Sequence, residues 1–431
     1  MIANRPYARS EALLDRALRH IPLGTQTFSK SAVAYPVGAA PLYIERAAGS
    51  HAWDADGREY VDFVNALLAV SLGYSDPDVT AAVRHQLDLG VIFSLPSPIE
   101  IEVAERICAM VPCAEMVRFG KNGSDATAGA VRIARGFTGR EHVAVCGYHG
   151  WQDWYIGSTT RNLGVPKAVR ELTHSFSYND LSSLEALFAE LPGQIAAVIL
   201  EPMNVAYPAQ GFLEGVRDLT HEHGAVLVFD ETITGFRFAK GGAQALFGVT
   251  PDLATFGKGL ANGYPLAAVA GRRDIMKLME EVFFSFTMGG ETLSLAAAKA
   301  VLDKIEREPV IERITAQGEK VIAGLKERIA RHGADGFASV SGHPAWSFLN
   351  LRDAPPYTVW QVRTLYLQEM FARGMLCLGT HNMSYAHSDE DVARLLVAYD
   401  EVLPLMRDAI ATGTLDSRLS CAPLVPLFRV R

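Results

Sequence analysis

Lys258 is the residue whose surroundings most clearly suggest chemistry. It lies in LATFGKGLANGYPLAAVAG (253–271), and it is the only cation between Lys240 and Arg272. A lysine shielded from water has a lowered pKa, and its neutral amine is a nucleophile that forms Schiff bases with carbonyl compounds. Because an isolated lysine in a loop is usually just solvated, Lys258 alone is a weak signal.

Asp230 is a second candidate because it directly follows the apolar run AVLVF (225–229). A carboxylate at the carboxyl end of a buried parallel strand lies where open α/β sheets place their ligands. Burial disfavours its charge, so an ionised Asp230 requires strong donors or a cation, and a protonated ring nitrogen would serve. An ion pair with the nearby Arg237 is an equally good explanation of the same carboxylate.

A third feature is the stretch FGKNGSDA (119–126), which runs into a helical pattern. Its glycines permit a tight turn, and the exposed amides at a helix start form a natural phosphate site. It lacks the GxxxxGK[ST] pattern of nucleotide-binding P-loops, and simple capping of a helix by Ser124 or Asp125 is the more common outcome. Together, a phosphate cradle, a carboxylate and a Schiff-base lysine meet the protein-side requirements of pyridoxal 5′-phosphate (PLP).

These residues need a rigid scaffold, and the hydrophobic pattern predicts one. Between about 76 and 305, helical stretches alternate with the short apolar runs HVAVCG (142–147), AAVIL (196–200), AVLVF (225–229) and LAAVAG (266–271). Such runs predict a parallel sheet that is covered by helices, with one helix over 125–137 and a long one over 292–307.

The two ends of the chain have a different pattern. Two short β-like runs surround a DADG turn within residues 41–64, and a helical pattern precedes them at 10–20. After residue 309 we expect a helix over 311–333, a β-rich stretch around 337–351 and a charged helix over 388–412. The last 120 or so residues therefore predict a smaller α+β domain.

Composition excludes several classes of protein. The 431 residues carry 40 Lys+Arg and 48 Asp+Glu, a net charge of −8, which gives no electrostatic drive towards nucleic acid. The five cysteines form no CxxC pair, so they predict neither a disulfide scaffold nor a zinc site. We expect neither a signal peptide nor a membrane span, and we predict a cytoplasmic protein.

The sequence resembles the class III (omega) aminotransferases of PLP fold type I, and within them the glutamate-1-semialdehyde 2,1-aminomutase-like branch. The stretches that carry this resemblance are VRFGKNGSDATAGAVRIARGFTGR, GYHGWQDW, VILEPMN, VFDETITGFR, PDLATFGKGLANGYPLAAVAGRRDIM and SFTMGGETLSLAAAKA. The resemblance implies an α/β fold with a mostly parallel seven-stranded sheet at 76–308. Residues 1–75 and 309–431 would form one small α+β domain, and two copies would share active sites in a homodimer.

The resemblance also implies roles for single residues. Lys258 would form the Schiff base and move the proton, while Asp230 would pair with the pyridine nitrogen. The remaining cofactor contacts would be Gly123 and Ser124 at the phosphate, Tyr148 stacked on the ring, Glu201 near the cofactor hydroxyl, Thr232 packed beneath the ring, and Thr287 reaching the phosphate of the neighbouring subunit.

The reaction is predicted to be transamination between an amino donor and a keto or aldehyde acceptor. Glutamate-semialdehyde aminomutases carry an arginine in an N-terminal SPVR-like segment, whereas GTQTFSK (24–30) has none and offers only Lys30 to an anion. The stretch LANGY (260–264) also departs from their pattern. An intramolecular aminomutase is the second expectation, an amino-acid epimerase a further one, and a non-catalytic PLP-fold protein a remote one.

Other residues have simpler explanations. His149 is expected to be a structural donor in its turn, and the aromatic group Trp151, Trp154 and Tyr155 fits either a substrate pocket or core packing. His381 and His387 suggest a metal, but solvated histidines beside a helix capped by Ser388 are the better interpretation. Lys121 is either close to the phosphate or directed into solvent.

Overall fold

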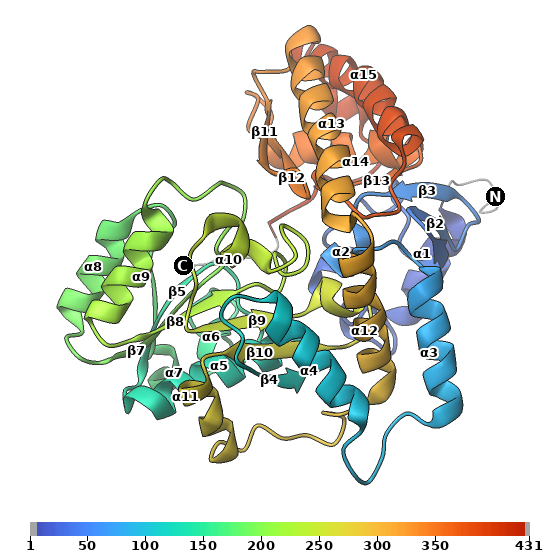
Figure 1. Cartoon of the computed structure of the whole chain (residues 1–431). Coiled ribbons are helices and arrows are strands. Elements are labelled where there is room, and N and C mark those ends of the chain that lie inside the picture. The colour runs from blue at the N-terminus through green and yellow to red at the C-terminus, as the bar shows by residue number, and fades with distance from the viewer. Residues whose placement is uncertain (1–6, 427–431) are drawn as a thin grey trace. The chain divides into compact units, whose positions relative to one another are not determined.

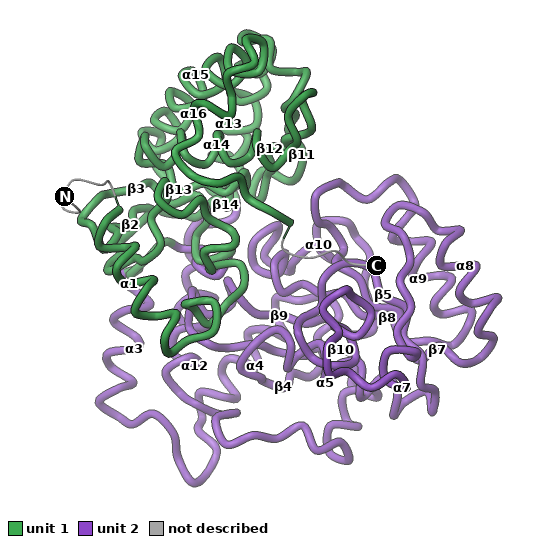
Figure 2. The backbone as a smooth tube through the Cα atoms, turned by 180° about the vertical axis from the view of Figure 1, so that it is seen from behind, with its two compact units in different colours: residues 1–67, 73–76, 312–427 green, residues 68–72, 77–311, 428–431 purple. Residues whose placement is uncertain are grey.

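The computed structural model describes residues 7–426 (Figure 1). The chain divides into two compact units, and neither is one continuous segment (Figure 2). Of the described residues, unit 1 comprises 7–67, 73–76 and 312–426, and unit 2 comprises 68–72 and 77–311. Unit 1 therefore takes residues from both halves of the chain, while unit 2 contains most of the middle.

Unit 2 is built on a seven-stranded sheet with the order β4-β10-β9-β8-β7-β5-β6. The strands are β4 (Met116–Gly120), β5 (His142–Cys146), β6 (Thr173–Ser175), β7 (Ile195–Leu200), β8 (Val226–Asp230), β9 (Leu253–Phe256) and β10 (Ala267–Gly271). The pairs from β6 across to β9 are parallel, whereas β10 runs antiparallel to both β9 and β4. The predicted mostly parallel sheet of seven strands is confirmed.

The central strands are apolar because helices cover both faces of the sheet. Every residue of β7, β8, β9 and β10 is buried. Along β5, Val143 and Val145 pack with α5 (Gly123–Thr138) in one core, while the alternate residue Ala144 packs in a second core with α8 (Leu181–Glu190) and α9 (Phe212–Glu222). Alternate strand residues point to opposite faces, so the two cores lie on opposite sides of the sheet.

Unit 2 contains further helices. They are α3 (Pro77–Leu89), α4 (Pro98–Met110), α6 (Asp153–Ile156), α7 (Lys167–Arg170), α10 (Gly242–Phe247), α11 (Arg273–Met276) and α12 (Thr292–Arg307), with 3-10 turns η3 (Lys258–Ala261) and η4 (Lys277–Glu280). The helix predicted over 292–307 is present with those bounds. Within the described residues, no helix is both long and apolar enough to cross a membrane.

Unit 1 joins the two ends of the chain through a sheet. β1 (Ile44–Ala48), β2 (His51–Asp54) and β3 (Glu59–Asp62) form an antiparallel meander, and β13 (Met375–Leu376) pairs with β3 in parallel. The predicted DADG turn joins β2 to β3. A second sheet has the order β11 (Ala338–His343), β12 (Trp346–Leu351) and β14 (Thr380–Asn382).

The helices of this part of the chain are mostly long. They are α1 (Ala8–Ala17), α13 (Val310–Arg331), α14 (Val359–Ala372), α15 (Asp389–Ala411) and α16 (Leu415–Arg418), with 3-10 turns η1 (Pro22–Gly24) and η2 (Phe28–Lys30). The short element α2 (Asn65–Leu68) is a left-handed turn, because its φ angles lie between 46° and 69°. Non-glycine residues adopt this conformation at a cost, so the surrounding structure must impose it.

One expectation about unit 1 is confirmed and another is wrong. Ser388 caps α15, since its hydroxyl accepts a hydrogen bond from the Asp391 N–H at 3.1 Å. His381 and His387 are not solvated but completely buried. The His381 ring contacts the Ser347 hydroxyl (3.0 Å) and the Tyr399 hydroxyl (2.7 Å), so partners distant in sequence stabilise it. In the described part of the chain, no cluster of three or more His, Cys, Asp or Glu could hold a metal ion.

Candidate active site

The start of α5 forms an anion site. Asn122 caps the helix by accepting a hydrogen bond from the Asp125 N–H at 3.1 Å. The first helical amides, those of Gly123 and Ser124, have no partner among residues 7–426, because the helix itself offers them none. The Ser124 hydroxyl accepts the Trp151 N–H at 3.2 Å and retains its own proton to donate. Two amides, a hydroxyl and the helix dipole suit a phosphate.

The turn after β5 packs directly on this anion site. Gly150 has a φ of +105°, and a Cβ atom on it would lie 2.3 Å from Ser124 Oγ. Only glycine allows both this backbone conformation and this close approach. The turn therefore positions Tyr148 and His149 beside the phosphate loop.

Asp230 is the last residue of β8 and is almost completely buried. Its Oδ1 accepts hydrogen bonds from the Thr232 hydroxyl (2.6 Å) and the Thr255 hydroxyl (3.1 Å). Burial on its own would raise the pKa of Asp230, but the hydrogen bond and charge of His149 and the Thr232 donors hold this pKa below its usual range. The alternative pairing with Arg237 is wrong, since the Arg237 guanidinium donates to Leu68 O and the Ser71 hydroxyl, both at 2.9 Å.

His149 has a more specific role than a donor within its own turn. Its Nδ1 lies 2.8 Å from Asp230 Oδ2, and its Nε2 lies 3.2 Å from the Cys146 carbonyl. The imidazole is buried and packs edge-on against Tyr155, with ring centroids 5.3 Å apart. The expectation of a purely local donor missed this contact because the two residues are 81 positions apart.

Lys258 follows β9 and begins the turn η3. Its φ is +44°, a left-handed conformation that is unusual and costly for a lysine. Burial lowers the pKa of its amine to about 8, even though the negative charges of Glu201 and Asp230 act to raise that pKa. Neither a hydrogen bond nor an ion pair engages this amine among residues 7–426, so it is available to react.

Glu201 directly follows β7 and interacts electrostatically with Asp230, His149 and Lys258. It accepts the Tyr148 N–H at 3.0 Å and the Asn204 side-chain amide at 2.8 Å. Burial, followed by the nearby charge of Asp230, raises the pKa of this carboxyl. The Tyr148 ring is half exposed and stands edge-on to Tyr155, with ring centroids 5.6 Å apart.

A cavity of about 300 Å³ in unit 2 brings the predicted residues together. Of the predicted site residues, those that line it are Gly123, Ser124, Tyr148, Glu201, Asp230, Thr232 and Lys258. Thr287 does not line it and is exposed between η4 and α12. Lys121 lines the cavity too, but its amine pairs with Glu291 at 2.9 Å instead of pointing into solvent.

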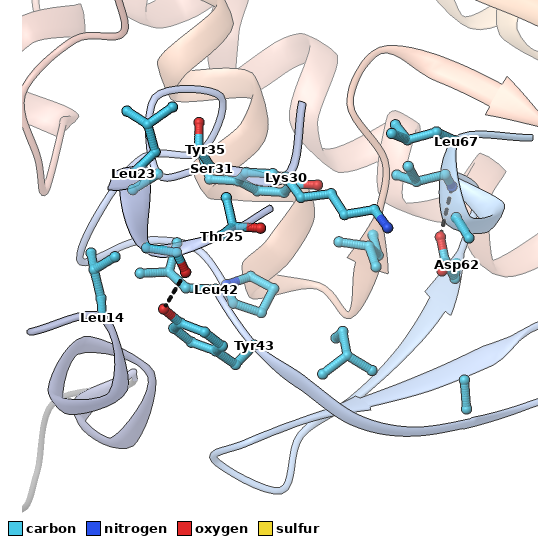
Figure 3. Close-up of a pocket in the computed structure, with 18 of the residues that line it drawn as sticks. Leu14, Leu23, Thr25, Lys30, Ser31, Tyr35, Leu42, Tyr43, Asp62 and Leu67 are labelled. Atoms are coloured by element: carbon cyan, nitrogen blue, oxygen red, sulfur yellow. Dashed lines mark hydrogen bonds between the residues drawn. The ribbon is translucent and has the colours of Figure 1, made fainter. Parts of the chain in front are cut away.

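The other sequence candidates lie elsewhere. Trp154 and Tyr155 are buried in the core beside α5, so for these two the packing interpretation is confirmed, while Trp151 is exposed. Lys30 lines a separate cavity of about 340 Å³ in unit 1, together with Thr25, Tyr35 and Tyr43. Figure 3 shows the Lys30 side chain extending into that cavity.

Comparison with known proteins agrees with this geometry. The family model for class-III aminotransferases matches residues 32–388. The chain belongs to this family. It is 33% identical over 406 residues to the 3-aminobutyryl-CoA aminotransferase of Cloacimonas acidaminovorans (strain Evry), covering 92% of this chain and 97% of that protein.

Solved structures support the same fold. The PLP internal aldimine form of the FumI protein from Sphingopyxis sp. MTA144 superposes with a TM-score of 0.88 at 30% identity, covering 96% of this chain and 99% of that one. A glutamate-1-semialdehyde aminomutase from Pseudomonas aeruginosa PAO1 superposes with a TM-score of 0.79 at 23% identity, covering 94% and 95%, and this likeness shows the fold alone. This class III chain is a PLP-dependent aminotransferase, as its sequence predicts.

The residues present fit PLP. The free amides at Gly123 and Ser124 suit its phosphate, and the Asp230 carboxylate suits a cationic ring nitrogen. The unpaired Lys258 amine in the same cavity suits its carbonyl carbon.

Proposed function

We propose that this aminotransferase moves an amino group between two separate molecules, and that at least one of them carries its amine on a carbon without a carboxylate. The observation behind the proposal is the set of cations that line the unit 2 cavity. Among its described lining residues only Lys121, His149 and Lys258 can carry a positive charge, and none is an arginine.

Each of these three groups already has another task. Lys121 pairs with Glu291, His149 contacts Asp230, and Lys258 is the reactive amine. A substrate carboxylate is best held by the bidentate fork of arginine, which these residues do not provide. The 3-aminobutyryl-CoA aminotransferase acts, by its name, on a thioester, and this supports an amine that is remote from a free carboxylate.

Residues of the chain divide the work of the reaction. When bound, PLP supplies the carbonyl carbon that captures the amine and the ring that delocalises the electrons of the bond broken at the substrate carbon. Because its pKa is about 8, Lys258 Nζ is partly neutral near that pH and accepts the proton from this carbon. Asp230 remains an anion, so it stabilises positive charge on the ring nitrogen.

Half-reactions test the proposal. The PLP form would be mixed with one amine at a time, namely a simple primary amine, a 3-aminoacyl thioester and an α-amino acid, and the loss of PLP absorbance followed. We expect the first two to complete the half-reaction faster than the α-amino acid. Glutamate-1-semialdehyde alone is the decisive control, because complete turnover of that compound without a partner would establish the intramolecular aminomutase instead.

We further propose that two copies associate through an apolar surface of unit 2. We define this surface by the large apolar side chains that are exposed on α3, on α4, on the segment that joins them and on the segment before α12. They are Leu87, Leu89, Phe93, Leu95, Ile101, Phe283 and Met288. A cavity of about 650 Å³, lined by Ile101, Phe284 and Phe286 among others, runs between α4 and the segment that carries Thr287. Exposed apolar patches of this kind mark association sites, and a two-fold pairing would present Thr287 to the partner.

Light scattering would measure the association directly. Leu95→Glu is expected to reduce the mass from that of two chains to that of one and to weaken PLP binding. Leu163→Glu is the matched control, because Leu163 is fully exposed in unit 2 but outside this surface. A wild-type protein with the mass of a single chain would contradict the dimer.

A further inference from the structure

Thr232 makes an unusual contact for a residue expected only to pack beneath the cofactor ring. It follows Asp230 by two positions, and its hydroxyl lies 2.6 Å from Asp230 Oδ1. Its backbone N–H donates to the same oxygen at 3.1 Å. In an ordinary aspartate turn the carboxylate accepts only the backbone N–H two residues on, whereas here it also accepts the hydroxyl of the same residue.

The two carboxylate oxygens of Asp230 are consequently not equivalent. Oδ1 receives the Thr232 N–H and hydroxyl and also the Thr255 hydroxyl, whereas the described residues give Oδ2 only His149 Nδ1, at 2.8 Å. A carboxylate oxygen has about two acceptor sites. Oδ1 is therefore fully occupied, and Oδ2 retains one acceptor site.

The orientation of the Thr232 side chain is fixed by two glycines. A Cβ atom on Gly123 would lie 3.0 Å from Thr232 Cγ2, and one on Gly257 would lie 3.2 Å from it. The methyl group thus fills the space between the phosphate loop and the residue before Lys258. Because threonine has a single χ1 angle with staggered minima, holding the methyl there directs the hydroxyl to Asp230.

We propose that Thr232 is a positioning residue that acts through Asp230. Its hydroxyl occupies Oδ1 and so directs the cofactor ring nitrogen to Oδ2. The same hydrogen bond keeps the proton between the carboxylate and the ring on the ring nitrogen. The proposal rests on Asp230 being the partner of the ring nitrogen. The physical reason is that a donor to the carboxylate stabilises its anionic form, so the proton favours the ring. The ionisable groups around Asp230 are His149, Glu201, Lys258, Tyr148 and Tyr155, and substitution of Thr232 leaves all of them in place.

The experiment measures the ring nitrogen itself. Wild type and the variants Thr232→Ser, Thr232→Ala and Thr232→Val would be loaded with PLP labelled with ¹⁵N in the ring, and the ¹⁵N chemical shift recorded at one pH. Wild type and Thr232→Ser are expected to show a protonated nitrogen. Thr232→Ala and Thr232→Val are expected to move the ¹⁵N chemical shift towards that of neutral pyridine. They are also expected to lower kcat roughly tenfold, which corresponds to a change of about one pKa unit.

Controls separate the hydroxyl from general damage. Thr159→Ala removes another buried threonine of unit 2, whose hydroxyl donates to Ile156 O at 2.8 Å outside the cavity, and should leave the shift unchanged. Thr232→Val replaces Thr232→Ala if the latter fails to load PLP. A wild-type shift in the loaded Ala or Val variant, or a displaced shift in Thr232→Ser, overturns the proposal. Asp230→Asn tests separately the assumption that Asp230 is the partner of the ring nitrogen, because a wild-type ¹⁵N shift in this variant means that it is not.

Discussion

The His149 imidazole and the Asp230 carboxylate lie 2.8 Å apart, although they leave the ends of strands β5 and β8, which are separated in the sheet by β7. Both side chains are almost completely buried. Their contact places a donor against Oδ2 of Asp230, so the charge state of this carboxylate depends on a residue outside the predicted cofactor set.

Removal of this donor should weaken both binding and turnover. In His149→Phe, Asp230 loses its Oδ2 donor and its pKa should rise, so we expect kcat to fall by roughly tenfold or more, with a smaller loss of PLP affinity. His149→Asn retains an amide donor and should recover part of the loss. Fluorescence titration with PLP and steady-state kinetics would measure both quantities, and wild-type kinetics for His149→Phe would contradict the role.

Loss of the Asp230 charge should separate binding from catalysis. Asp230→Asn keeps the size of the side chain but cannot hold a positive ring nitrogen, so turnover is expected to fall by more than about a hundredfold. Much of the PLP binding should remain, because the phosphate contacts at the start of α5 are unchanged. Near-normal kcat in this variant would show that another group serves the ring.

The reactivity of Lys258 should follow its lowered pKa. The amine is charged below about pH 8 and neutral above it, so PLP capture by the cofactor-free protein should accelerate as the pH rises through about 8. Stopped-flow absorbance would record this rate, and acetylation of exposed Lys167 in the same samples would report the behaviour of a solvated lysine. A capture rate that changes only above about pH 10 would contradict the effect of burial.

Gly150 should be irreplaceable for phosphate binding. In Gly150→Ala the new methyl group would collide with Ser124 Oγ, and we expect PLP affinity to fall by at least about tenfold. Gly164→Ala is the matched control, since its φ is also left-handed at +87° but no atom lies within 4 Å of the added Cβ. An equal loss of PLP affinity in the two variants would attribute the effect to backbone strain instead of the clash.

Much of this scaffold was predictable from sequence because its strands are buried on both faces. The runs at 195–200 and 226–229 are apolar throughout, and a helix such as 292–307 has an apolar face of regular spacing. Strand direction is a different matter. The run at 267–271 looks like its neighbours, yet β10 is antiparallel, because composition does not record which end of a strand the chain enters.

The candidate site was predictable only as a set of single residues. Lys258 and Asp230 could be recognised from their local surroundings, but the contact of His149 with Asp230 depends on the order of strands in the sheet. The buried state of His381 depends on Tyr399, which comes from another helix. The hydroxyl of Thr232 could not be assigned because its direction follows from glycines at 123 and 257.

The pairing of β13 with β3 also has a consequence for how the polypeptide is made. Met375 pairs with Val61 across more than 300 residues, so during translation the edge of β3 opposite β2 has no partner strand while nearly all of unit 2 emerges. Unit 2 can form early, since residues 77–311 are continuous, whereas the N-terminal meander keeps an open edge until the last helices arrive. An open edge is prone to aggregation, so chains truncated before residue 375 should be recovered mainly as insoluble protein.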